Sequence, residues 1–327
     1  MPLYCLMCRI SKLQKSILDM EYKLDVQTIF ELGKRTNQED SMSPTHGNAD
    51  VKDRVFVLCD GMGGHSAGEV ASGIVAETLR GSVLARWTDG EFSDEIFKQA
   101  LSDAYDALDK ADDGAVKKMG TTMTFLCLHQ GGATIAHIGD SRVYHIRPAA
   151  SENDTAILFQ TSDHSLVNDL VKIGEMTPEE AKVSKQKNVI TRAMQPNMER
   201  RSSAEIHHIS DVKPGDYFFM CTDGILENME DDNISYIFSD EGGDIRNKVD
   251  IIVEATSENR DNHSAFLIHV VDTELNMPVC QGGKPQHTAI RFWIILFVAV
   301  LTLLAIFLLV SKCSGTEWHV PDILKSN

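Results

Sequence analysis

Phe56-Val57-Leu58-Cys59-Asp60-Gly61-Met62-Gly63-Gly64-His65 is a stretch in which an apolar run leads into a carboxylate and a glycine cluster. Residues 55–59 are apolar and β-branched or bulky, which predicts a short buried strand. Asp60 then follows the strand, and the glycines allow a sharp turn and a close approach to a ligand. Two interpretations of Asp60 are open: a metal-binding carboxylate, or a turn residue that accepts bonds from backbone amides.

Acidic residues recur beside other predicted strands. Strands are predicted over residues 24–32, 217–221 and 265–271, and the acids near them are Glu39, Asp40, Asp223 and Asp261. Arg35 precedes the first pair, and its planar guanidinium suits phosphate oxygens. Each turn alone is explained as well by a solvated loop. Together they favour a site for two divalent cations, and oxygen ligands favour Mg²⁺ or Mn²⁺ over Zn²⁺.

The remaining periodicity predicts a mixture of helices and strands. Apolar residues at helical spacing predict helices over residues 67–84, 92–111 and 244–256. Strands over 121–128, 133–138 and 142–146 are interpreted as an antiparallel meander, with the turn Gly139-Asp140-Ser141 before the last strand. Asp140 in that turn is also explained by ordinary turn chemistry. Thr177-Pro178-Glu179-Glu180 is typical of a capped helix start.

Composition limits the class of protein. The 327 residues carry a net charge of -17, which argues against a nucleic-acid-binding surface, and 43% are hydrophobic, enough for a packed core. The seven cysteines are scattered, which predicts reduced thiols in a cytosolic domain. Cys5 and Cys8 form a single Cys-x-x-Cys, a weak metal or redox signal.

The two ends differ from the middle of the chain. Residues 1–19 are predicted to be an N-terminal arm, 20–273 the main folded domain and 274–290 a linker. Residues 292–310 contain one polar side chain, Thr302, and no charge, and at about 1.5 Å per residue they span roughly 30 Å. We therefore expect a transmembrane helix over 291–311, a cytoplasmic location for the main domain and an extracytoplasmic tail over 312–327.

Six motifs follow one another in a fixed order. They are Arg-Thr-Asn-Gln-Glu-Asp at 35–40, Asp-Gly-Met-Gly-Gly-His at 60–65, Met-Gly-Thr-Thr at 119–122, Gly-Asp-Ser-Arg at 139–142, Thr-Asp-Gly at 222–224 and Arg-Asp-Asn at 260–262. This set resembles the metal-dependent, type 2C family of protein serine/threonine phosphatases in its bacterial form. The resemblance covers residues ~22 to 272.

The resemblance implies a fold and a set of residue roles. The fold is α+β, a four-layer α-β-β-α sandwich of two antiparallel sheets flanked by helices. Asp60 would bridge two Mn²⁺ or Mg²⁺ ions, and the Gly61 carbonyl would ligate one of them. The other positions implied are Asp223 and Asp261 as metal ligands, Glu39 through water, Asp40 in support, Asp140 at a weaker third ion, and Arg35 on the substrate phosphate.

The implied reaction is the hydrolysis of phosphoserine and phosphothreonine in proteins by a metal-activated bridging water. The implied partners are phosphorylated proteins and a serine/threonine protein kinase, and the catalytic domain would be a monomer. Met62 stands where eukaryotic relatives place a histidine, and residues 184–188 lack the His-Pro often seen in the family's flap.

Two other functions remain open from the sequence. A catalytically inactive phosphatase-like domain would bind phosphoproteins at the membrane, but Asp60, Asp223 and Asp261 are all present. A phosphodiesterase or nuclease is opposed by the acidic charge and by the absence of histidine ligands from the motifs.

Overall fold

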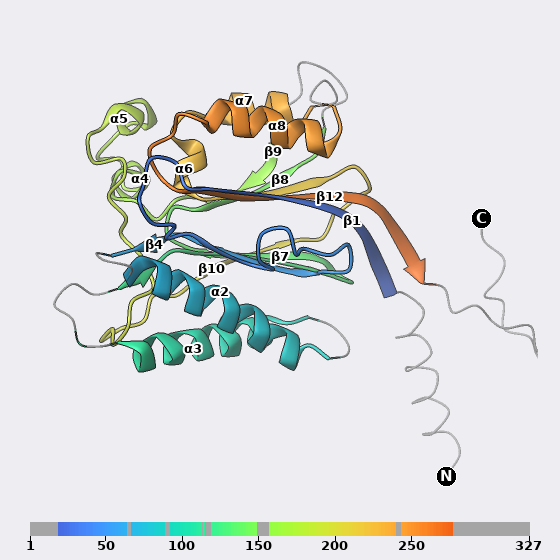
Figure 1. Cartoon of the computed structure of the whole chain (residues 1–327), viewed down its shortest axis with the longest axis horizontal. Helices are drawn as coiled ribbons and strands as arrows, with labels where there is room; N and C mark the ends of the chain where they lie inside the picture. The colour runs from blue at the N-terminus through green and yellow to red at the C-terminus, as the bar shows by residue number, and fades with distance from the viewer. Residues whose placement is uncertain are drawn as a thin grey trace, which may run out of the picture. The chain divides into compact units, whose positions relative to one another are not determined.

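The computed structural model describes residues 19–63, 67–88, 92–112, 114, 119–148, 157–239 and 243–276. These residues belong to one compact unit, Met1–Met277, and the second unit, Pro278–Asn327, lies outside the described residues. Two five-stranded antiparallel sheets pack face to face, with helices on the outer side of each (Figure 1). The predicted sandwich of two antiparallel sheets flanked by helices is confirmed.

The first sheet contains both ends of the described chain. Its strands, in spatial order, are β1 (Asp19–Glu31), β12 (His263–Asn276), β11 (Tyr217–Cys221), β8 (Arg142–Ile146) and β9 (Ile157–Gln160). Strands β1 and β12 pair along their whole length, from Asp19↔Asn276 to Glu31↔His263. This pairing carries the strands slightly past the predicted limits of the domain, 20 and 273.

The second sheet contains the strand before Asp60. Its strands, in spatial order, are β10 (Glu205–Ile209), β7 (Gly132–Ile138), β6 (Met123–His129), β3 (Val55–Cys59) and β2 (Ser41–Ser43). A separate two-stranded sheet joins β4 (Gly61–Met62) to β5 (Gly120–Thr121).

Helices cover the outer faces of both sheets. On the second sheet lie α2 (Ala67–Arg86) and α3 (Asp94–Ala111), and on the first lie α7 (Asp231–Ile237) and α8 (Ile245–Thr256) (Figure 1). The described chain also contains three short helices, namely α4 (Leu166–Lys172), α5 (Pro178–Val183) and α6 (Asp223–Leu226). The capping box predicted at Thr177 and Glu180 is present.

Strand β3 shows how the sequence builds these layers. All five of its residues are buried, and its side chains alternate between two apolar clusters. Val55, Val57 and Cys59 pack with α2 and α3, whereas Phe56 and Leu58 pack between the sheets. A continuous apolar run is therefore required, because both faces of this strand are covered.

The predicted meander over 121–146 is wrong in its last step. Strands β6 and β7 form a hairpin, but β8 pairs with β9 and β11 of the other sheet. The turn Gly139-Asp140-Ser141 therefore crosses between sheets, with Gly139 at φ 112°. A strand's alternation is the same in either sheet, so the pattern alone does not reveal this crossing.

Several sequence predictions lie on residues at the two ends of the chain. The N-terminal arm up to residue 18, the linker beyond 276, the transmembrane segment 291–311 and the tail 312–327 lie outside the described residues. In the part of the chain that the structure describes, no helix is long and apolar enough to span a bilayer. The cysteines of the described part, Cys59, Cys127 and Cys221, are buried and unpaired, as predicted.

Candidate active site

Asp60 is fixed by its backbone at the end of β3. Its amide donates to Thr122 Oγ1 at 2.9 Å, and its carbonyl accepts from Thr122 N at 2.8 Å and Thr121 Oγ1 at 2.9 Å. These bonds satisfy the backbone polar groups of Asp60 without its side chain. The turn therefore does not depend on the Asp60 carboxylate, which can serve as a metal ligand.

Gly61 allows two segments to meet backbone to backbone. Its amide donates to Glu39 O at 3.1 Å, and a Cβ at this position would lie 2.3 Å from Gly68 O and 2.4 Å from Glu39 O. A Cβ on Gly68 would in turn lie 3.0 Å from the carboxyl carbon of Glu39. The Glu39 carboxylate thus lies at the start of α2, beside the turn that carries Asp60.

Asp223 is the first residue of α6, and one residue, Thr222, separates it from the end of β11. The preceding hydroxyl, Thr222 Oγ1, donates to Asp40 Oδ2 at 3.0 Å and orients that buried carboxylate. A Cβ on Gly224 would lie 2.0 Å from Asn262 O, so α6 touches the segment that holds Asp261. Three acidic segments, far apart in sequence, are joined here by direct contacts.

Arg35 and Asp261 form an ion pair at the rim of the site. Arg35 Nη2 lies 2.5 Å from Asp261 Oδ2, and 53% of the Arg35 side chain is exposed. This hydrogen bond is the main cause that raises the pKa of Arg35. Asn262 fixes the same corner, because its side chain accepts from Glu39 N at 2.8 Å and donates to Leu32 O at 2.9 Å.

Asp140 occupies the turn that crosses between the sheets. It is buried, and its Oδ1 has no hydrogen-bond partner among the described residues. The turn is held by Ser141 Oγ, 2.8 Å from Thr122 Oγ1, and by the Gly139 carbonyl, which accepts from His164 N at 2.9 Å. An unpaired buried carboxylate oxygen needs a cation or a water to satisfy it.

The carboxylates raise one another's pKa values. Burial raises the pKa of Asp40 to about 7, with Asp223 adding to the effect, and burial and Asp223 raise the pKa of Asp140 to about 7. Burial, Asp40 and Asp223 raise the pKa of Asp60 well above its usual range, and burial is the main cause that raises the pKa of Asp223. Ionised together, these groups require positive charge between them.

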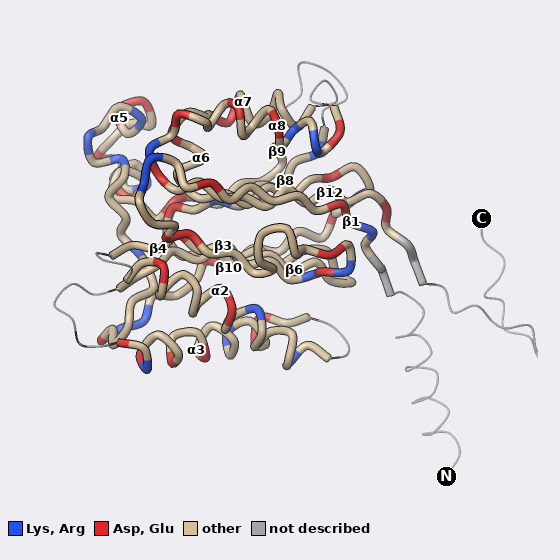
Figure 2. The backbone as a smooth tube through the Cα atoms, viewed as in Figure 1, with Lys and Arg blue, Asp and Glu red and all other residues tan. Residues whose placement is uncertain are grey.

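Divalent cations fit this set of residues. The donors are oxygen atoms, they are brought together by five separate turns, and one of them, at Asp140, has no hydrogen-bond partner among the described residues. Figure 2 shows acidic segments from several strands at the end of the sandwich that carries β4 and α6. The sequence-predicted site residues Arg35, Glu39, Asp40, Asp60, Asp140, Asp223 and Asp261 lie in or beside this cluster, whereas Cys5 and Cys8 lie outside the described residues.

Three supporting side chains carry no role in the sequence interpretation. Thr122, Thr222 and Asn262 hold the backbone or carboxylates of Asp60, Asp40 and Glu39. Each belongs to one of the six sequence motifs. Its supporting role could not be predicted, because that role depends on contacts between segments that are distant in sequence.

Comparisons with known proteins place the chain in a family. Residues 32–250 match the family described as protein phosphatase 2C. The protein phosphatase PhpP of Streptococcus pneumoniae is 33% identical over 213 residues, which are 63% of this chain and 80% of that protein.

Solved structures agree with the sequence match. The serine/threonine phosphatase Stp1 from Staphylococcus aureus has a TM-score of 0.61 and 29% identity, and covers 76% of this chain and 95% of its own. The catalytic domain of the serine threonine protein phosphatase PstP, in complex with 2 manganese ions, has a TM-score of 0.61 and 27% identity. That match covers 76% of this chain and 99% of the PstP chain.

The acidic cluster, the two-sheet fold and the relatives agree with one another. The homologues are named as protein phosphatases and the structural neighbours as serine/threonine phosphatases, one of them with bound manganese. The chain belongs to the protein phosphatase 2C family, and it is a protein serine/threonine phosphatase that uses Mn²⁺ or Mg²⁺.

Proposed function

We propose that this phosphatase hydrolyses phosphoserine and phosphothreonine in proteins with two cations held by Asp60, the Gly61 carbonyl, Asp223 and Asp261. The observation that carries the proposal is that the turns of Asp60, Asp223 and Asp261, and the turn of Glu39 and Asp40, meet in one cluster without enough positive charge of its own. Glu39 would approach the cations through water, and Asp40 would support the cluster. Asp140 would contact a weaker third ion.

The cations would supply the charge that activates a water and offsets the phosphoryl oxygens. The chain's own contribution is to position and to bind. Thr121 and Thr122 fix Asp60, and Thr222 fixes Asp40. Arg35 would bind the substrate phosphate and exchange its bond to Asp261 for bonds to phosphate oxygens. Met62 carries no titratable proton, so position 62 supplies no acid to the leaving group.

Turnover of p-nitrophenyl phosphate tests this mechanism. The full-length chain should be active with Mn²⁺, Asp60→Asn should lose that activity, and Asp232→Asn on the exposed side of α7 should keep it. Activity that survives Asp60→Asn would contradict the mechanism. An inactive wild type that still binds phosphopeptides would favour the alternative of a catalytically dead, phosphoprotein-binding domain.

We also propose that residues 292–310 anchor the enzyme in the cell membrane, with the catalytic domain on the cytoplasmic side. Nineteen residues without a charge support this, because their length matches the hydrocarbon core of a bilayer. Full-length protein should sediment with membranes and be released only by detergent. Protein that stays in the supernatant after high-speed centrifugation would contradict the anchor.

The proposed partners are phosphorylated proteins, including a serine/threonine kinase and its substrates. The support is the family to which the chain belongs together with the proposed anchor, which would place the domain near membrane-bound kinases. We propose that the catalytic domain acts as a monomer and binds no nucleic acid, in keeping with its acidic charge. Phosphoproteomics of a deletion strain against wild type should identify substrates by raised phosphoserine and phosphothreonine occupancy.

A further inference from the structure

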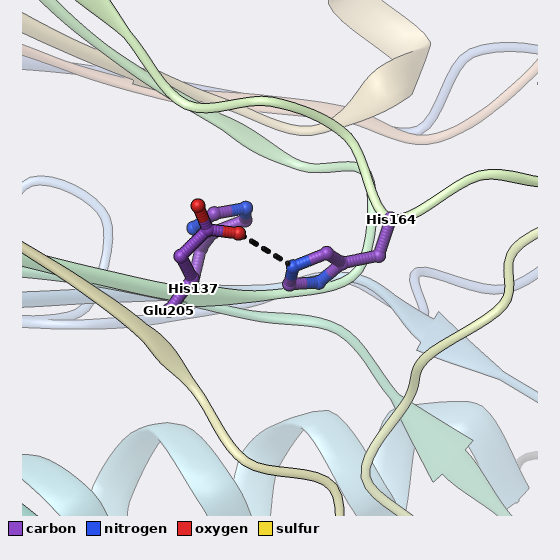
Figure 3. A group of neighbouring side chains, drawn as sticks. All are labelled: His137, His164 and Glu205. Carbon is purple, nitrogen blue, oxygen red and sulfur yellow. Dashed lines mark hydrogen bonds and ion pairs between the residues drawn. The ribbon is translucent and has the colours of Figure 1, made fainter. Parts of the chain in front are cut away.

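A second group of side chains that could bind a metal contains histidines, unlike the acidic cluster, which contains only oxygen donors. His137 on β7 and Glu205 on β10 are directly paired across the second sheet. His164 reaches them from the segment before α4, and the potential ligand atoms of these three residues lie within 4.8 Å of one another. Figure 3 shows the three side chains converging. His207 lies two residues after Glu205 on β10, hence on the same face.

His137 has one ring nitrogen with no assigned use. The residue is fully buried, and its Nε2 donates to Ser162 O at 3.0 Å. That bond places the proton on Nε2, so Nδ1 carries a lone pair, and Nδ1 is buried without a hydrogen-bond partner among the described residues. Burial lowers the pKa of His137 to about 4, which keeps this ring neutral near pH 7.

His207 has a second unused nitrogen, which lies beside Glu205. Its Nε2 is buried without a hydrogen-bond partner in the described part of the chain, and it lies 3.5 Å from Glu205 Oε1. The ring centroids of His137 and His207 are 6.2 Å apart. With a zinc–nitrogen bond of about 2.0 Å, two rings on one tetrahedral zinc have centroids roughly 5–6 Å apart, so the His207 ring would have to move toward His137 for both to bind one ion.

His164 has a different role, which its tautomer decides. Its Nδ1 accepts from Gly139 N at 3.1 Å, so its proton is on Nε2 and is donated to Glu205 Oε2 at 3.2 Å. Its ring also stacks on His137 at 4.4 Å with an interplanar angle of 9°. Ring lone pairs lie in the ring plane, and two stacked parallel planes do not share one ion between them. Arg192 Nη1, 3.2 Å from Nε2, borders this side of the group.

We propose that His137 Nδ1, His207 Nε2 and Glu205 bind a zinc ion, with His164 orienting the carboxylate. Two imidazoles and one carboxylate suit zinc, whereas Mg²⁺ prefers oxygen ligands, so the site is chemically distinct from the acidic cluster. Carboxylates that bind a metal are themselves held by hydrogen bonds from outside the site, and His164 would supply that bond to Glu205. The ion would link β7 to the edge strand β10 beside the turn that carries Asp140.

Zinc binding by the full-length chain in saturating Mg²⁺ tests the proposal. Calorimetry and metal analysis should show one zinc per chain, and Co²⁺ in its place should give the visible absorption of a low-coordinate site. His207→Gln should weaken zinc binding roughly 100-fold and His164→Gln about 10-fold, as loss of a ligand and of its outer partner respectively. The matched control is His208→Gln, whose side chain is 58% exposed on the other face of β10 and pairs with Asp94.

Three outcomes would overturn the assignment. Wild-type protein that binds no zinc in Mg²⁺ would remove the site, and equal zinc affinity in His207→Gln and His208→Gln would remove His207 as a ligand. A loss in His164→Gln as large as in His207→Gln would make His164 a ligand instead. Zinc binding should persist in Asp60→Asn, so the result is independent of the acidic cluster. Circular dichroism of each variant should confirm that it is folded.

Discussion

Arg35 is the residue on which phosphate binding depends in the proposed mechanism. It lies at the rim of the acidic cluster, half exposed, with Asp261 as its partner. Arg35→Ala should lower kcat/KM for a phosphopeptide about 10- to 100-fold, because a hydrogen bond to a charged group contributes about 1.5–3 kcal/mol. Arg35→Lys keeps the charge but not the planar guanidinium, so its kcat/KM should lie between those of wild type and Arg35→Ala. Steady-state kinetics with Mn²⁺ measure this.

The neighbouring cation provides the control for Arg35. Lys34 is similarly exposed, and it pairs at 2.7 Å with Glu258, which is not one of the acids of the cluster. Lys34→Ala should leave kcat/KM within about twofold, since exposed ion pairs contribute little. An equal loss in both variants would mean that general surface charge, and not the Arg35 guanidinium, binds the phosphate.

Gly224 and Gly81 are predicted to respond to alanine in opposite directions. A Cβ on Gly224 would lie 2.0 Å from the Asn262 carbonyl, so Gly224→Ala must displace α6 and with it Asp223. We expect Gly224→Ala to lower the free energy of unfolding by about 1–3 kcal/mol and to weaken Mn²⁺ binding. Gly81 is exposed within α2 and its Cβ would meet nothing within 4 Å, so Gly81→Ala should add up to about 1 kcal/mol. Thermal unfolding with and without Mn²⁺ distinguishes the two, and a stabilised Gly224→Ala would contradict the contact.

Single residues differ in how far the sequence predicts them. The acids are predictable because carboxylates beside strand ends and glycines are a local pattern, as at Asp60 and Asp223. The hydroxyls of Thr122 and Thr222 are not, because their partners are distant in sequence. The histidine group is the clearest case. His137, His164 and Glu205 belong to three different segments: the pairing of β7 with β10 joins His137 to Glu205, and His164 meets them from the segment before α4.

At the scale of elements, Lys248 links two helices on the first sheet. It is a buried lysine of α8, and its Nζ donates to Ile237 O at 2.9 Å and Ser239 O at 2.8 Å, at the end of α7. Lys248→Met keeps the apolar stem but leaves both carbonyls unsatisfied. We expect a loss of about 2–4 kcal/mol and a fall in Tm of roughly 5–15 °C.

A surface lysine serves as the comparison for Lys248. Lys213 is 56% exposed and pairs with the exposed acid Asp211 at 3.0 Å. Lys213→Met should change the free energy of unfolding by less than about 0.5 kcal/mol. Similar Tm values for the two variants would show that the carbonyls at the end of α7 find other partners.

The elements themselves are largely predictable, and their partners are not. Helix periodicity identifies α2 and α3, and the capping box identifies α5. The sheet to which β8 belongs is not predictable from its alternation, because Arg142–Ile146 would be equally buried in either sheet. Strand β10 is the weakest signal, since Glu205 and two histidines interrupt its apolar residues.

On the scale of the whole molecule, the acidic cluster makes stability depend on cations and on pH together. The folded pKa values of Asp40 and Asp140 are about 7, above the ordinary value of about 4. Below pH 4 their contribution to stability is fully present, and it is lost as the pH rises through 7. Protein freed of divalent cations by a chelator should therefore lose stability between pH 6 and pH 8. Adding Mn²⁺ should increase the free energy of unfolding more at pH 8 than at pH 6.

A variant separates this effect from the other titrating groups. Burial lowers the pKa of His137 and His164, and these rings act in the opposite direction as the pH rises. Comparing wild type with Asp140→Asn cancels their contribution. The gain in Tm on adding Mn²⁺ should be larger at pH 8 than at pH 6 in wild type, and this difference should shrink in Asp140→Asn. An equal gain at both pH values in wild type would mean that the cations do not relieve repulsion among the buried carboxylates.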